Sequence, residues 1–159
     1  MDWAPIGRVS ANTPTYPDTF APPASPATYL YRVRIGVTAA NGVEFTSAPS
    51  ALDYATIATV LFSDEPLTAG VTRIKGVHIG ELRQAIDAVR RAANLSPAWT
   101  SYAPATGPVT AADNLQARQQ LDQAVNLLLL HGVSYTGETP AANGKIWWYQ
   151  LQQIRDGVR

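Results

Sequence analysis

The sequence has no cysteine and little charge, and both absences narrow what the protein can do. Without cysteine the chain has neither a disulfide framework nor thiol chemistry. The 12 Lys and Arg residues balance the 12 Asp and Glu residues, and charged residues make up only 15% of the chain. Such a composition implies no basic face, so we expect no nucleic-acid partner. It also means that little charge repulsion keeps copies of the chain apart at neutral pH.

Long apolar runs are missing as well. The longest, residues 125–130, is interrupted by Asn126, and a membrane helix needs about 18 apolar residues. The first residues lack the basic and apolar stretches of a signal peptide. The protein is therefore expected to be either cytoplasmic or exported by a signal outside this chain. The second alternative is favoured by only two lysines beside many Thr, Ser, Ala and Pro residues.

Motifs that carry enzyme chemistry are also absent from the sequence. It contains no Gly-x-Ser-x-Gly elbow, phosphate-binding loop, His-Glu-x-x-His motif or dinucleotide fingerprint. We therefore expect a protein that is not an enzyme, with no catalytic residue, no cofactor and no bound metal.

The first 59 residues have the pattern of β-structure. Seven of the twelve prolines lie within residues 1–49 and separate short strand-like runs. Residues 6–9 form a weak run, and residues 54–60 a final one. In the strongest run, residues 29–37, every second side chain is apolar or aromatic, which predicts one strand with a buried face. These side chains are Tyr29, Tyr31, Val33, Ile35 and Val37. Asn41-Gly42 then predicts a tight turn into another short strand.

Residues 60–159 have the pattern of helices, and one loop-and-helix unit occurs twice. Ile74 to Arg83 is matched position by position by Ile146 to Arg155, 72 residues later. A polar loop that begins with an aromatic residue precedes each copy, at Phe62 and Tyr135. A duplicated unit indicates packing and assembly rather than a single catalytic centre.

Apolar spacing predicts three helices in this part of the chain. The first helix has Thr72 as its N-cap and carries Arg83, Asp87 and Arg91 on its exposed face. Its expected buried residues are Ile79, Leu82, Ile86, Val89 and Ala93.

The second helix is predicted to open with a capping box of Thr110 and Asp113. It is expected to end near His131 and Gly132, because glycine commonly stops a helix. The third is predicted to begin near Lys145. Its expected buried residues are Trp147, Leu151, Ile154 and Val158.

The β part resembles the second half of a fibronectin type III domain. Residues 29–34 look like that family's sixth strand, and residues 41–50 look like the turn into its last strand. The resemblance implies an antiparallel β-sandwich, but this chain has about four strands where the family has seven. A sheet that lacks strands leaves apolar faces and edges open. The chain is therefore a fragment, a sheet rearranged onto its own helices, or a sheet completed by a neighbouring molecule.

The helical part resembles a module found at the C-termini of secreted bacterial multidomain proteins, often after fibronectin type III domains. The phrase that carries this resemblance is Ile74 to Arg83, with the loop at residues 61–72 before it. The resemblance implies an extracellular, non-catalytic setting. The predicted fold is thus α+β: a partial fibronectin type III-like β region at 1–59, followed by a three-helix bundle at 60–159.

Aromatic residues are the main candidates for recognition. Trp147, Trp148 and Tyr149 follow one another on a helix, and successive helical residues turn by about 100°, so they cannot all face one core. We expect Trp148 or Tyr149 to be exposed, for stacking on a sugar or anchoring an interface. The alternative is that they cover the β part or the proline-rich linker. Tyr29 and Tyr31 are the further interaction candidates.

Several polar residues can be interpreted either as structural or as functional. His78 is expected to hydrogen-bond to the preceding loop rather than to bind a metal, and His131 to lie at a helix end. Asp64 and Glu65 are read as favourable charges before a helix rather than as calcium ligands. Asn94 heads an Asn-Leu-Ser sequon and is a possible glycosylation site.

Together these patterns favour a bacterial structural or adhesive module at the cell surface that associates with copies of itself, as a filament or surface-assembly subunit. Neighbouring domains of a larger surface protein are the other expected partners. Two alternatives remain open: a carbohydrate- or protein-binding module that uses exposed aromatics, and a virion or tail-associated structural protein.

Overall fold

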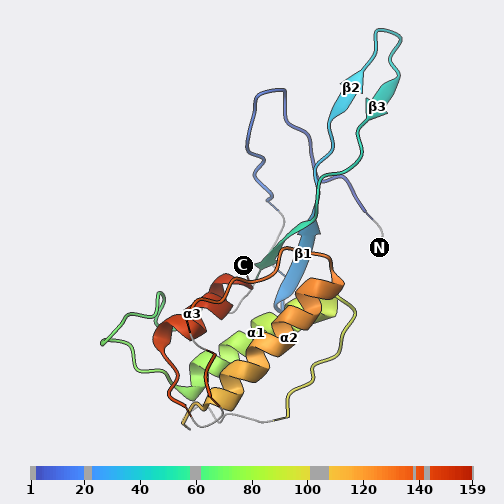
Figure 1. The fold of residues 1–159 in the computed structure, drawn as a ribbon. Helices are drawn as coiled ribbons and strands as arrows, with labels where there is room; N and C mark the ends of the chain where they lie inside the picture. The colour runs from blue at the N-terminus through green and yellow to red at the C-terminus, as the bar shows by residue number, and fades with distance from the viewer. Residues whose placement is uncertain are drawn as a thin grey trace.

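The computed structural model describes residues 3–19, 23–57, 62–100, 108–137, 139–141 and 144–158. Within these residues the fold is mixed α+β, with four short antiparallel strands and three helices (Figure 1). The strands are β1 (Ala27–Tyr31), β2 (Gly36–Thr38), β3 (Glu44–Thr46) and β4 (Asp53–Ile57). The helices are α1 (Gly76–Ala92), α2 (Ala111–Leu127) and α3 (Trp148–Asp156).

The strands form two separate two-stranded sheets. β1 pairs with β4 in the register Ala27↔Ile57 to Tyr31↔Asp53, and β2 pairs with β3 around Val37. The prediction of one strand over residues 29–37 is therefore wrong. The run divides because its first half, β1, pairs with β4. Its second half, β2, pairs instead with β3, the strand that follows the turn at Asn41 and Gly42. The predicted last strand is described as far as residue 57, and residues 58–60 lie outside the described part.

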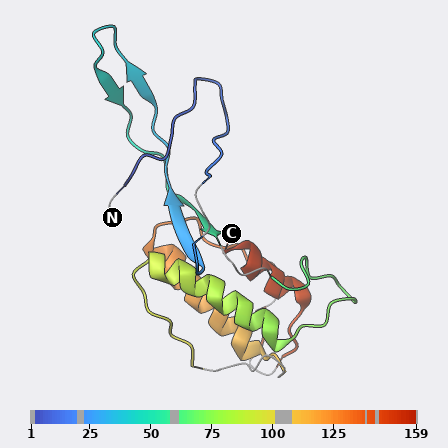
Figure 2. The same ribbon diagram turned by 180° about the vertical axis from the view of Figure 1, so that it is seen from behind.

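The sheet of β1 and β4 packs on the helices, and the hairpin of β2 and β3 extends away from them (Figures 1 and 2). Leu30, Leu52 and Tyr54 lie against the helical core. The hairpin turn follows the prediction, since Gly42 has a φ of +82° and the Asn41 side chain accepts the N–H of Val43 at 3.1 Å. Residues 6–9 belong to no strand.

The helical core has the composition that the apolar spacing predicts. In α1 the expected stripe is buried: Ile79, Leu82, Ile86 and Val89 are 0% exposed and Ala93 is 6% exposed. Leu151, Ile154 and Val158 of the third predicted helix are buried as well. Thr72, however, is not the cap of α1, which begins after Lys75.

All three helices begin with the same cap. In each, the backbone N–H of the N-cap residue donates to the side chain of the third helical residue, which satisfies a donor that a helix start leaves open. The pairs are Lys75–His78, Thr110–Asp113 and Trp147–Gln150, at 3.3, 2.9 and 3.0 Å. The predicted capping box of α2 is confirmed. The unit around α2 is thus a third copy, which sequence comparison of the two outer copies does not reveal.

Each helix also carries an arginine five residues after that third position, stacked on an aromatic ring from the loop before another helix. The guanidinium carbon lies 4.9, 4.4 and 4.7 Å from the ring centroid in the three stacks, within cation–π range. The stacks are Arg83–Trp99, Arg118–Tyr135 and Arg155–Phe62. Because the last ring precedes α1, the three units close on one another in a cycle.

The residue after each ring is tied to the sixth residue of the helix that follows. The three contacts join Ser63 to Glu81, Thr100 to Gln116 and Thr136 to Gln153. Each loop therefore contacts two helices. Its aromatic ring stacks on the arginine of the helix before it in the cycle, and its Ser or Thr hydrogen-bonds to the helix after it. Arg83 takes part in this closure and is only 7% exposed, so its predicted place on an exposed face is wrong.

The ends of α1 and α2 are equivalent too, and the predicted end of α2 is wrong. Asn94 after α1 and Leu129 after α2 have φ angles of 58° and 55°, the left-handed conformation that closes a helix. α2 thus ends at Leu127, before His131 and Gly132. The prediction failed because leucine occupies the position where glycine or asparagine usually stands.

Candidate interaction surface

The β2–β3 hairpin presents an apolar face that no described residue covers. Because Val37 and Phe45 are paired and side chains alternate along a strand, five apolar side chains share this face. The Ser47 N–H donates to the Ile35 carbonyl at 2.9 Å, which continues the ladder beyond β2. The exposed fractions are Val33 71%, Ile35 70%, Val37 60%, Val43 47% and Phe45 62%.

The other face of the hairpin is polar and carries charges. It bears Arg34, Thr38, Glu44 and Thr46 by the same alternation. Glu44 forms an ion pair with Arg8 at 2.5 Å. The chain's own N-terminal segment therefore approaches the polar face, while the apolar face remains open.

The alternating apolar pattern of residues 29–37 predicted one buried face. The structure confirms burial only for the first part of this run. Tyr29 and Tyr31, in β1, are half-buried, and the Tyr31 hydroxyl donates to Asp18 at 3.1 Å. Val33, Ile35 and Val37 are exposed, because the hairpin leaves the helical part where β1 ends (Figure 1). Alternation shows that a face is built for burial, but not which molecule covers it.

The three consecutive aromatics lie at the start of α3, and the prediction for Trp147 is wrong. Trp147 is 55% exposed, because it is the extended N-cap residue rather than part of the helix. Trp148 and Tyr149 are half-buried, with ring centroids 6.1 Å apart and planes at 89°. Trp148 packs against the helical core. Trp147 is therefore the aromatic of this group that is available to a partner.

His78 has the structural role that the sequence predicts. It is 0% exposed, its Nδ1 accepts the Lys75 N–H, and its Nε2 lies 3.2 Å from the Asp64 carboxylate in the preceding loop. Asp64 also lies 3.7 Å from the ammonium of Lys75. Among the described residues no group of three or more His, Cys, Asp or Glu is placed to hold a metal.

Two further polar candidates lie at helix ends. Asn94 is exposed, and its left-handed φ makes it the residue that closes α1. His131 is exposed beyond the end of α2. Glu65 lies in the exposed loop before α1.

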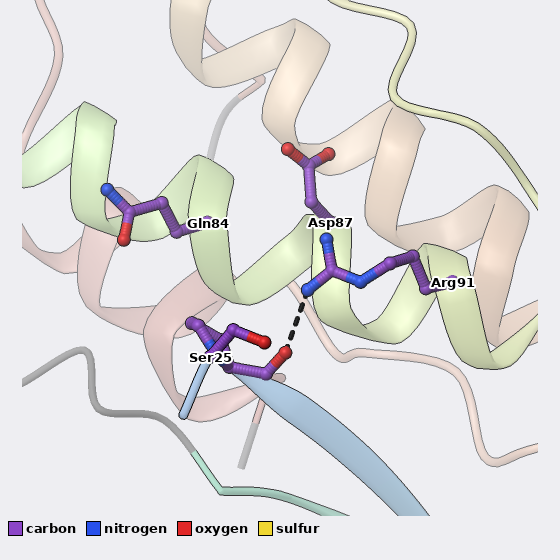
Figure 3. Close-up of a pocket in the computed structure, with 5 residues that line it drawn as sticks. Ser25, Gln84, Asp87 and Arg91 are labelled. Carbon is purple, nitrogen blue, oxygen red and sulfur yellow. Dashed lines mark hydrogen bonds between the residues drawn. The ribbon is translucent and has the colours of Figure 1, made fainter. Parts of the chain in front are cut away.

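Two hollows in the described surface are small. One, of about 210 Å³, lies between the start of β1 and α1, where Arg91 donates to the Pro26 carbonyl at 2.7 Å beside Ser25, Gln84 and Asp87 (Figure 3). Burial raises the pKa of Asp87 there, although the Trp99 N–H bond opposes the shift. The other, of about 310 Å³, is lined in part by Tyr54 and His131. Ligand pockets usually hold about 300–1,000 Å³, so the first is too small and the second is at the lower limit.

No helix in the described part of the chain is long and apolar enough to span a membrane. Comparison of the sequence with protein-family models and with curated proteins, and of the fold with solved structures, gives no match. The arrangement of the described residues is therefore the basis for assigning a function.

Proposed function

We propose that this chain is a non-enzymatic structural module that associates with copies of itself at a bacterial cell surface. The observation that carries the proposal is the uncovered apolar face of the hairpin, residues 33–37 and 43–45. A two-stranded hairpin is marginally stable in water unless its apolar face packs on something. A second copy of the chain is the cover that we propose.

Three properties of the chain support a second copy as the cover. The apolar face carries no charge, and the formal net charge of the chain is zero, so two copies meet without strong repulsion. The resemblance to half of a fibronectin type III sandwich supports the same reading, since such a half needs a second layer. The extracellular setting rests on the resemblance of the helical part to a module of secreted proteins.

The expected strength follows from the exposed fractions. Burying a Val, Ile or Phe side chain contributes about 1.5–3 kcal/mol, and these five are already partly buried. Each therefore has about 1 kcal/mol left to gain, or about 5 kcal/mol for the five side chains of one face. Association costs about 4–15 kcal/mol in lost freedom of motion. Because this cost uses most of the gain, we expect weak, reversible association that depends on protein concentration.

The test compares two neighbouring substitutions on opposite faces of β2. Val37→Lys places an ammonium group in the apolar face, whereas Thr38→Lys adds the same group on the polar face. Sedimentation velocity and negative-stain microscopy of the purified chains should show assembly for wild type and Thr38→Lys and monomers for Val37→Lys. Strictly monomeric wild-type protein at all concentrations would refute the proposal.

A binding module for carbohydrate or protein is the second candidate, and the exposure of Trp147 favours it. An exposed indole can stack on a sugar ring or anchor an interface. Trp147→Ala separates the two candidates. A binding module would bind to a glycan array as wild type and lose this binding as Trp147→Ala. A module that associates through the hairpin face would show no glycan binding that depends on Trp147 and would keep its assembly in the variant.

A further inference from the structure

The C-terminal end of α2 carries a second exposed apolar patch, made of Leu127 and Leu129. Leu127 is 59% exposed and Leu129 is 87% exposed. Leu129 also has a φ of 55°, in the left-handed region that residues other than Gly, Asn and Asp rarely adopt. An apolar side chain is thus held in an unfavourable backbone conformation and points away from the core.

Closing the helix does not explain this leucine. The equivalent position after α1 is Asn94, with nearly the same φ and the same hydrogen bonds. The next residue donates back to the helix in both cases, Leu95 to the Arg90 carbonyl at 2.8 Å and Leu130 to the Val125 carbonyl at 3.1 Å. Asparagine therefore makes the same cap with less strain. A strained and exposed residue is a reason to look for a role outside the folding of its own chain.

The two apolar patches do not cover each other within one molecule. The hairpin extends away from the helices, whereas α2 ends on the β1 side of the helical part (Figures 1 and 2). Both patches are exposed. If two hairpin faces paired across a twofold axis, Leu127 and Leu129 would stay in water on each copy. A contact between unlike patches would instead place the five side chains of the hairpin face and the two leucines against apolar surface.

We propose that Leu127 and Leu129 of one copy dock on the apolar hairpin face of the next copy, so that the chains join head to tail. The inference rests on the proposed self-association and specifies its geometry. A contact between two different surfaces leaves one of each unused at the ends, so it extends into an open filament unless the rotation closes a ring. Five side chains on a face are few beside the 20–30 residues per side of a stable interface, so each contact is weak and the chains join only at high protein concentration.

The first test is Leu129→Asn, which copies the residue that closes α1. Because asparagine tolerates the left-handed conformation, Tm of the variant should rise by about 2–4 °C. Its self-association should nevertheless weaken at least tenfold in sedimentation velocity. Loss of assembly in a more stable protein separates docking from folding. Leu127→Lys tests the other leucine, and Val71→Lys, at an apolar residue that is 80% exposed on the loop before α1, is the matched control.

The second test mixes two variants that each lack one patch. Val37→Lys keeps the leucines and Leu129→Asn keeps the hairpin face, so neither should assemble alone. Mixed, they should form a one-to-one dimer that cannot grow, with its mass measured by light scattering.

Each other outcome is decisive. If wild type assembles and Leu129→Asn and Leu127→Lys assemble equally well, the head-to-tail contact is refuted while the proposed self-association stands. Absence of the mixed dimer also overturns it. If wild type is monomeric, the proposed function itself fails.

Discussion

Replacing the buried Arg83 tests the cyclic arrangement of the helices. Its guanidinium donates to the Asp113 carboxylate at 2.9 Å, and the two side chains are 9% and 5% exposed. The same guanidinium lies over the Trp99 ring. Arg83→Met keeps a long apolar stem but leaves the carboxylate buried without its cation.

The expected loss follows from this geometry. Breaking a buried ion pair by removing one partner destabilises a protein by about 3–5 kcal/mol. The Thr110 N–H and hydroxyl still donate to Asp113, so we expect a value near the lower limit, about 3 kcal/mol. In a chain of this size 1 kcal/mol corresponds to about 2–4 °C, so Tm should fall by about 6–12 °C.

Urea and thermal unfolding, each followed by far-UV circular dichroism and tryptophan fluorescence, measure this loss. Coincident transitions with both probes are needed before a free energy is taken from them. Arg91→Met is the control, since Arg91 is exposed and, among the described residues, its guanidinium donates to the Pro26 carbonyl. This substitution should cost about 1 kcal/mol or less. A loss below 1 kcal/mol for Arg83→Met as well would show that the arginine stacks do not hold the helices together.

Two further predictions concern Tyr54 and His78. Burial raises the pKa of Tyr54 to about 12, above the value near 10 of an unfolded tyrosine, so stability is fully present below about pH 10 and is lost as pH rises toward 12. With a discount for partial exposure, the loss is about 1–2 kcal/mol. Thermal unfolding at alkaline pH should show it, and Tyr54→Phe should reduce it. His78→Gln places at the start of α1 the residue that caps α3, Gln150. The free energy of unfolding of His78→Gln should lie within about 1 kcal/mol of the wild-type value. His78→Leu should be less stable than His78→Gln, because leucine leaves the Lys75 N–H without its acceptor. Equal stability of the two variants in urea would contradict the shared cap.

The helical part could be predicted from the sequence where side-chain spacing alone decides the outcome. The buried stripe of α1 and the capping box at Thr110 are local patterns, and both are confirmed. The third repeat could not be found, because its aligned positions differ in type: Asn114 stands where α1 has Ile79. The signal that remained was the arginine five residues after each cap partner, at positions 83, 118 and 155.

Errors arose where one residue takes an unusual conformation or where tertiary partners decide. Leu129 adopts the left-handed conformation that is usually found at glycine. The sequence therefore predicted that α2 ends near Gly132, whereas the helix ends at Leu127. Trp147 was expected inside the third helix, yet it is the extended residue before it. The run of residues 29–37 was divided because its halves pair with different strands. None of these outcomes is encoded in local periodicity.

The uncovered hairpin face and the strained leucine point to the same conclusion from opposite directions. A strict two-residue alternation ending in Val33, Ile35 and Val37 has no use on a strand that stays in water on both faces, because either face could then be polar. Leu129, likewise, closes α2 in a conformation that asparagine, which closes α1 at position 94, adopts with less strain. Exposed apolar side chains and a left-handed leucine are both unfavourable in an isolated molecule. Both are explained if an apolar surface of another molecule covers them. A contact between copies supplies both surfaces from one sequence, which is why the two leucines, rather than an unrelated partner, are the residues to test first.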